Sequence, residues 1–300
     1  MSDLFSAWSN LSRTEQTRLL RNHIEHVRAQ RIARHKQAIA DHRRKLAVTP
    51  GMLSPLNLFA DGDSWFDYPL PVLGPNDTIT SIGKHGTPQP FILNLAHYGD
   101  EARNLLGARQ RERIITNLVD KENGDFDAIL FSGGGNDTVG DPFCLWIKDY
   151  IPGTPPAQGM NRQRLDAVLG VVRSAYQDLI SIRDQVAPQC SIFIHGYDFA
   201  IPTGEGVCDN LIGPWLKPSL DLRGWKDRAT ATQVVKEFLL QFQSMLKQIA
   251  GSHKDVIYVE TQGTLQPDEW ANELHPTPEG FDKIAAKFLA ALRERFPRRI

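Results

Sequence analysis

Short apolar runs alternate with long helix-compatible stretches from about residue 57 to the end of the chain. The runs are rich in Leu, Ile, Val and Phe and are followed by turn-forming residues, as expected of buried strands. They cover residues 58–60, 91–96, 126–131, 191–195 and 256–259. Because strands separated by helices form βαβ units, the pattern predicts a five-stranded parallel sheet with helices on both faces.

Helical sequence separates most of these strands. The stretches cover residues 100–121, 161–186, 226–249 and 277–295. Residues 69–90 carry many Pro and Gly residues and predict a loop instead. Two further segments, 139–160 and 197–224, combine Pro, Gly and aromatic residues, and we expect them to form inserts over one edge of the sheet.

The first fifty residues have a different character. Residues 12–46 contain neither Gly nor Pro and predict one long helix. From Arg13 to Lys45 ten Lys and Arg residues face three acidic residues, with a sparse apolar stripe. No aromatic residue interleaves the bases, so we expect packing on the main domain, a partner or a second copy rather than nucleic-acid or membrane binding. The predicted division is a basic helical extension (1–50) and an α/β/α domain (51–300).

Composition fits an ordinary globular protein. The chain has 300 residues, of which 41% are hydrophobic and 23% charged, and its formal net charge of -1 argues against a dedicated nucleic-acid binder. Cys144, Cys190 and Cys208 form no close pair, which predicts neither a disulfide framework nor a zinc site. The sequence carries no signal-peptide pattern and no apolar run of membrane-spanning length, so we expect a cytoplasmic protein. Export without a cleaved signal stays open.

Polar residues follow the predicted strands at the carboxyl edge of the sheet, where open α/β folds bind their ligands. Ser64 comes directly after the first strand and the turn residues 61–63. Taken alone, such a serine is a common helix N-cap. With His275 as base, it becomes a candidate nucleophile. The backbone N–H groups of Ser64 and Gly99 and the side-chain amide of Asn136 are then candidate oxyanion donors.

Four segments carry a resemblance to a known family. Gly62-Asp63-Ser64, the segment 94–100 with Gly99, Gly134-Gly135-Asn136-Asp137, and His275-Pro276 occur in the order typical of the SGNH, or GDSL-type, serine hydrolases, which this sequence resembles. The resemblance covers about residue 57 to the C-terminus. It implies a three-layer α/β/α sandwich with a flavodoxin-like sheet, the SGNH hydrolase fold. It also implies a Ser64 nucleophile with a His275 base, and chemistry that needs no metal and no cofactor.

The residue three positions before the histidine departs from the family pattern, because Asn272 stands where the family usually has Asp. A carboxylate there would orient the imidazole and stabilise its protonated form. We consider three arrangements in an active site. Asn272 could orient His275 through its amide oxygen, a carboxylate of Glu273, Asp268 or Asp198 could replace the missing acid, or a backbone carbonyl could leave a Ser-His dyad. Asn272 without a role, or a loss of activity, is the remaining alternative.

The hypothesis that follows is a serine esterase that hydrolyses carboxylic esters, such as acetyl esters or lipids, through an acyl-enzyme on Ser64. Its partner would be a small-molecule ester, and the N-terminal helix could mediate a homo-oligomer or bind another protein. One alternative is an acyltransferase that uses the same residues. Another is a catalytically weak binding module with the same crevice.

Overall fold

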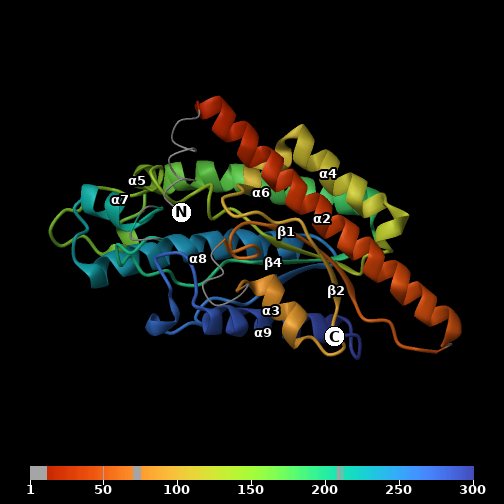
Figure 1. The fold of residues 1–300 in the computed structure, drawn as a ribbon. Helices are drawn as coiled ribbons and strands as arrows, with labels where there is room; N and C mark the ends of the chain where they lie inside the picture. The colour runs from red at the N-terminus through yellow and green to blue at the C-terminus, as the bar shows by residue number, and fades with distance from the viewer. Residues whose placement is uncertain (1–11, 50, 70–75, 208–209, 211) are drawn as a thin grey trace.

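The computed structural model describes residues 12–49, 51–69, 76–207, 210 and 212–300 (Figure 1). Three parts of the sequence-based predictions lie outside these ranges: the first eleven residues of the basic extension, residues 70–75 of the expected 69–90 loop, and Cys208. Cys144 and Cys190, which are described, are free thiols.

A five-stranded parallel sheet forms the centre of the molecule, as predicted. Its strands have the order β2-β1-β3-β4-β5, which is the flavodoxin-like order. They are β1 (Asn57–Gly62), β2 (Phe91–Asn94), β3 (Ala128–Ser132), β4 (Ser191–His195) and β5 (Val256–Val259). Residues of β1, β3 and β4 are buried throughout because helices cover both faces of the sheet.

Helices on the two faces complete the three-layer sandwich. On one face α3 (Thr78–His85) packs against α9 (Pro278–Arg295). The opposite face carries α4 (Ala108–Val119) and α6 (Arg162–Val186), and α6 also contacts α8 (Arg228–Ser252) (Figure 1). The predicted three-layer α/β/α fold is therefore confirmed.

The N-terminal helix α2 (Arg13–Val48) is a single 36-residue helix, as predicted. It begins with a capping box in which Ser12 and Glu15 satisfy each other's backbone N–H groups. The helix packs along β2, the edge strand of the sheet, and both of its ends extend away from the sheet (Figure 1). Its buried residues are only Arg28, His35 and Ile39, in keeping with the sparse apolar stripe.

The prediction of a loop over residues 69–90 is wrong in its second half, which contains α3. Asp77 caps this helix by accepting the N–H of Thr80 at 2.7 Å, and Ile79 and Ile82 are buried. This helix was not predicted because it has only eight residues and is flanked on both sides by Pro and Gly residues. In a smaller correction, the helix expected at 100–121 is divided into the 3-10 helix η1 (Ala102–Leu106) and α4.

Both predicted inserts are largely irregular. The 139–160 insert contains α5 (Phe143–Trp146) and the short 3-10 helix η3 (Pro156–Gln158), and the 197–224 insert contains α7 (Lys217–Leu222). A further short 3-10 helix, η2 (Lys121–Asn123), precedes β3, and η4 (Pro267–Glu269) precedes α9. Within the described ranges, no helix has an apolar stretch long enough to cross a bilayer.

Candidate active site

Ser64 lies at the carboxyl edge of the sheet because of the way β1 ends. Gly62 pairs with Ser132 of β3 and has a φ angle of 147°, and a Cβ atom at this position would lie 2.2 Å from the carbonyl oxygen of Ser132. Only glycine therefore allows the two strands to approach this closely. The N–H of Asp63 donates to the same carbonyl oxygen at 3.0 Å, and Ser64 follows with 9% of its surface exposed.

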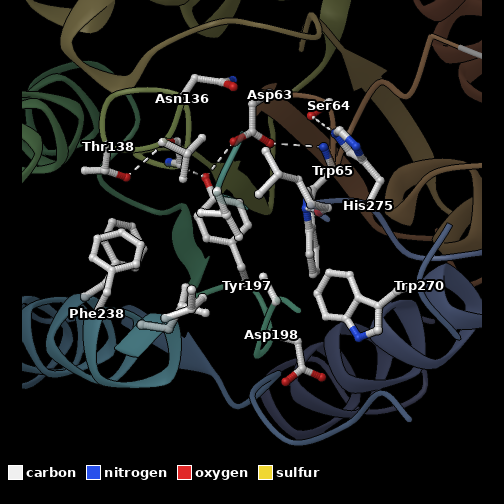
Figure 2. Close-up of a pocket in the computed structure, with 18 residues that line it drawn as sticks. Asp63, Ser64, Trp65, Asn136, Thr138, Tyr197, Asp198, Phe238, Trp270 and His275 are labelled. Atoms are coloured by element: carbon white, nitrogen blue, oxygen red, sulfur yellow. Dashed lines mark hydrogen bonds between the residues drawn. The ribbon is translucent and has the colours of Figure 1, made fainter. Parts of the chain in front are cut away.

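A chain of two hydrogen bonds links Ser64 to His275 and Asn272. The Ser64 hydroxyl lies 2.7 Å from Nε2 of His275 (Figure 2), and Nδ1 of the same ring lies 2.9 Å from Oδ1 of Asn272. His275 is buried, and the Tyr68 ring packs against it at 4.9 Å between ring centroids. Segments separated by more than 200 residues in the sequence thus form one hydrogen-bonded unit.

The orientation of the Asn272 amide fixes the tautomer of His275. Its Oδ1 accepts the backbone N–H groups of Leu274 and His275, both at 3.0 Å, so an acceptor oxygen must occupy this position. Nδ1 of His275 therefore carries the proton, and Nε2 is free to accept the proton of Ser64. Burial lowers the pKa of His275 to about 3, which keeps the ring neutral over the ordinary pH range.

Among the residues that the structure describes, no carboxylate makes a hydrogen bond with the ring nitrogens of His275. The carboxylate of Glu273, next in sequence to Asn272, is fully buried and binds the 197–224 insert instead. It accepts four backbone N–H groups at 2.6–3.0 Å, those of Gly204, Trp215, Leu216 and Lys217. Asp198 accepts N–H groups of Phe199 and of residues 263–265. Asp268 is exposed on η4.

The three expected oxyanion donors have spare N–H groups. Asn136 uses one side-chain N–H to bind the carbonyl oxygen of Asp100 at 2.9 Å, and its amide has a second. The backbone N–H groups of Ser64 and Gly99 make no hydrogen bond with any residue that the structure describes. Gly99 is exposed, with a φ angle of 79°. Asn136 lines the cavity beside Ser64, whereas Gly99 does not.

Asp63 joins the turn of Ser64 to β3 and to the segment that follows β4. Its carboxylate accepts the Ser132 hydroxyl at 2.8 Å and the Tyr197 hydroxyl at 2.5 Å (Figure 2), as well as the N–H of Trp65 at 3.0 Å. Burial raises the pKa of Asp63 to about 6. The sequence analysis missed Tyr197, because its contact with Asp63 joins residues 134 positions apart and depends on the packing of β4.

A cavity opens beside Ser64 and His275. Its wall is mostly apolar and comes from α8, from both inserts and from the segment before α9 (Figure 2); it includes Val139, Ala200, Leu216, Val235, Phe238, Leu239, Phe242, Trp270 and Leu274. The two carboxylates on the wall, Asp63 and Asp198, are already saturated with hydrogen bonds. The cavity has a volume of about 50 Å³.

Comparisons with known proteins match the fold of this chain to solved structures only. Neither the protein-family models nor the curated protein sequences give a match. Among 68 matching chains of known structure is a lipase from a goat rumen metagenome, with 15% identity, coverage of 79% of this chain and 97% of the lipase, and a TM-score of 0.47.

Two esterases show a similar likeness. A catalytic mutant of an acetylxylan esterase from Geobacillus stearothermophilus has 17% identity, coverage of 83% of this chain and 98% of the esterase, and a TM-score of 0.45. A carbohydrate esterase of family 3 from Talaromyces cellulolyticus has 14% identity, coverage of 80% and 97%, and a TM-score of 0.42. Likeness at this level says nothing about substrate, which depends on the chemistry of the site.

Proposed function

We propose that this protein is a serine esterase that hydrolyses carboxylic esters through an acyl-enzyme on Ser64. The observation that carries the proposal is the hydrogen-bonded chain from Ser64 through His275 to Asn272, with spare N–H donors beside the serine. A serine hydroxyl becomes nucleophilic when a neutral imidazole can take its proton. The resemblance to SGNH hydrolases supports the same assignment, because its segments meet at this edge of the sheet.

In the first half of the reaction, Nε2 of His275 takes the proton of Ser64 while the serine oxygen attacks the ester carbonyl carbon. Negative charge develops on the carbonyl oxygen. The backbone N–H groups of Ser64 and Gly99 and the second side-chain N–H of Asn136 stabilise it. His275 then gives its proton to the leaving alcohol. In the second half, His275 takes a proton from water while the water oxygen attacks the acyl carbon, and it returns that proton to the Ser64 oxygen as the acid leaves.

Asn272 orients His275 but gives it no counter-charge. Its amide oxygen holds the proton on Nδ1, which avoids the tautomer problem that makes such a replacement costly in other triads. The imidazolium formed during the reaction is, however, stabilised by a neutral acceptor only. We therefore expect a working enzyme whose turnover is slower than that of a complete triad.

The cavity favours esters with a short apolar acyl group. One water requires a cavity of about 10–15 Å³, so the cavity volume of about 50 Å³ accommodates only a few heavy atoms. Apart from the spare N–H donors of Ser64 and Asn136, the wall is mostly apolar and its two carboxylates are already hydrogen-bonded, so this surface matches a hydrocarbon. Acyl groups from acetyl to butanoyl fit these limits.

Labelling and turnover test this proposal together. A fluorophosphonate should label the wild-type protein but not Ser64→Ala, and short-chain p-nitrophenyl esters should be hydrolysed only by the wild type. Ser81→Ala, on α3, is a matched control that should keep both properties. Ester hydrolysis that survives in Ser64→Ala contradicts the proposal. Product analysis with an added alcohol separates hydrolysis from acyl transfer, which the same residues could perform.

A further inference from the structure

Helix α2 reaches the candidate active site through one buried arginine. Arg28 is only 7% exposed, although most of α2 faces solvent. Its Nε donates to the carbonyl oxygen of Leu95 at 3.0 Å, and one of its terminal nitrogens donates to the carboxylate of Asp100 at 2.9 Å. Burying a guanidinium is costly unless its donors are satisfied, so these bonds define where the helix docks.

The two acceptors of Arg28 lie on either side of Gly99. Leu95 and Asp100 are near the two ends of the segment that follows β2, and Gly99 lies between them without a side chain of its own. Apart from its chain neighbours, no atom of the residues described in the structure lies within 4 Å of the place where its Cβ would be. The position of the Gly99 N–H group therefore depends on how its neighbours are held. Arg28 holds both ends.

Asp100 connects the same arginine to the second oxyanion donor. Its carbonyl oxygen accepts the side-chain N–H of Asn136 at 2.9 Å, while its carboxylate binds Arg28. The N–H of Asp100 also donates to the carbonyl oxygen of His97 at 3.1 Å, which closes the turn around Gly99. One residue thus couples Arg28 to Gly99 through the backbone and to Asn136 through a hydrogen bond.

Arg31, one turn further along α2, strengthens the same attachment. It donates to the carbonyl oxygen of Ala96 at 3.0 Å and forms an ion pair with Asp67, which follows the Ser64 turn. The helix is therefore bonded to the segments after both β1 and β2. Arginine suits this task because its fixed fork of donors can bind two acceptors at once, whereas lysine offers a single flexible charge.

We propose that Arg28 is a positioning residue of the active site: by binding Leu95 and Asp100 it holds Gly99 and Asn136 where they stabilise the oxyanion. This inference rests on the proposed esterase function. The basic extension is then part of the catalytic machinery rather than an appendage. A purely structural role for Arg28 would affect stability but would leave the transition state of the folded enzyme unchanged.

The test compares Arg28→Ala, Arg28→Lys and a matched control, Arg43→Ala. Arg43 also joins α2 to the domain, through a hydrogen bond to the carbonyl oxygen of Lys121 at 2.8 Å, but lies fifteen residues further along the helix. Kinetics with p-nitrophenyl acetate, thermal unfolding and the affinity for a boronic acid, a tetrahedral analogue, are measured for each variant. Loss of one oxyanion donor costs about 10²–10³-fold in kcat.

For Arg28→Ala we expect kcat to fall by about 10²-fold with little change in KM, and the boronic acid to bind more weakly by a similar factor. Arg28→Lys should fall between Ala and wild type, and Arg43→Ala should match wild type. If Arg28→Ala does not fold, Asp100→Asn, which removes the ion pair and keeps the shape, should show the same kcat loss.

Three outcomes separate this inference from the function on which it rests. Activity that disappears in Ser64→Ala but is unchanged in folded Arg28→Ala or Asp100→Asn overturns the role of Arg28 alone. A kcat loss equally large in Arg43→Ala overturns it too, because the effect would then belong to the docking of α2 in general. Activity that persists in Ser64→Ala overturns the proposed function and this inference with it.

Discussion

Oδ1 of Asn272 accepts two hydrogen bonds from His275, one from the ring Nδ1–H at 2.9 Å and one from the backbone N–H at 3.0 Å. The ring and the main chain of His275 are thus bound to one oxygen atom. This arrangement fixes the ring in the tautomer that a general base requires, and it does so with a neutral group. The absence of a charge at this position leads to the first two predictions.

Asn272→Asp should increase kcat. A hydrogen bond to a charged acceptor is stronger than one to a neutral acceptor by about 1–2 kcal/mol, and the difference applies mainly when His275 is protonated in the transition state. We therefore expect a gain of about 5–30-fold, measured as initial rates with p-nitrophenyl acetate. Asn272→Ala, which removes the acceptor altogether, should lower kcat instead. A decrease in Asn272→Asp would contradict this explanation.

Activity should persist at acidic pH. His275 acts as a base only when neutral, and burial lowers its pKa to about 3, so kcat/KM should show no acidic limb near pH 6.5 and should stay level down to about pH 5. In Asn272→Asp the new carboxylate raises the pKa of His275, which moves the limb to higher pH. The pH profiles of the two proteins, measured in the same buffers, check both statements.

The same pKa shift predicts how His275 affects stability. The folded protein binds this proton only near pH 3, whereas the unfolded chain binds it near 6.5. Between these values the unfolded state holds more protons, so the free energy of unfolding decreases as the pH falls below 6.5, by up to about 1.4 kcal/mol per pH unit. Wild type should therefore lose stability relative to His275→Gln between pH 6.5 and 4, as measured by urea unfolding. Parallel curves would refute this.

Acyl-chain preference should follow the size of the cavity. Hydrolysis of p-nitrophenyl esters should be fastest for acetyl to butanoyl groups and fall steeply for octanoyl. Leu239→Ala enlarges the cavity and should shift the preference to longer chains, at a cost in stability of about 2–5 kcal/mol. Ala200→Val fills it and should restrict activity to acetyl. An unchanged chain-length profile in both variants would place the acyl group elsewhere.

Gly62→Ala should abolish activity. The added Cβ would lie 2.2 Å from the carbonyl oxygen of Ser132, and the φ angle of 147° is unfavourable for alanine, so the Ser64 turn must move or the protein must unfold. Gly170→Ala is the matched control. Gly170 lies exposed within α6 with no atom near its would-be Cβ, so we expect a gain of about 0.5–1 kcal/mol. Thermal unfolding and fluorophosphonate labelling measure both.

Glu273→Gln should lower stability without changing the pH profile of activity. The Glu273 carboxylate accepts four backbone N–H groups of the 197–224 insert, and an amide would turn a donor toward some of them. We expect a loss of about 2–4 kcal/mol on thermal unfolding. Unchanged stability of Glu273→Gln would contradict this prediction. An acidic limb shifted in pH would indicate instead that Glu273 acts on His275.

The sequence was sufficient for the sheet and for the position of Ser64. Buried strands have apolar runs that end in turn residues, and parallel strands bring their carboxyl ends together, so local patterns were enough to predict the edge where the candidate residues lie. Helix α3 was not predicted, because its two buried isoleucines, Ile79 and Ile82, are too few to give a clear helical repeat of apolar positions. Its N-cap, Asp77, was the available signal.

Long-range partners could not be predicted in the same way. Glu273 was a candidate acid because it lies next to Asn272 in sequence, but its carboxylate faces an insert about sixty residues earlier in the chain. The sequence did not distinguish Arg28 from the other nine Lys and Arg residues of α2. Only the packing of α2 on β2 places it against Asp100. Association of a partner or a second copy with the exposed face of α2 stays a prediction.

The adjacent side chains of Asn272 and Glu273 have a mechanical consequence. One binds His275 and the next binds the 197–224 insert, with no residue between them to act as a hinge. A swing of the insert away from the cavity would pull on the segment that carries His275 and would separate it from Ser64. In the proposed mechanism, catalysis therefore requires the insert to keep its observed contacts with Glu273, and a substrate that displaces the insert would also displace His275.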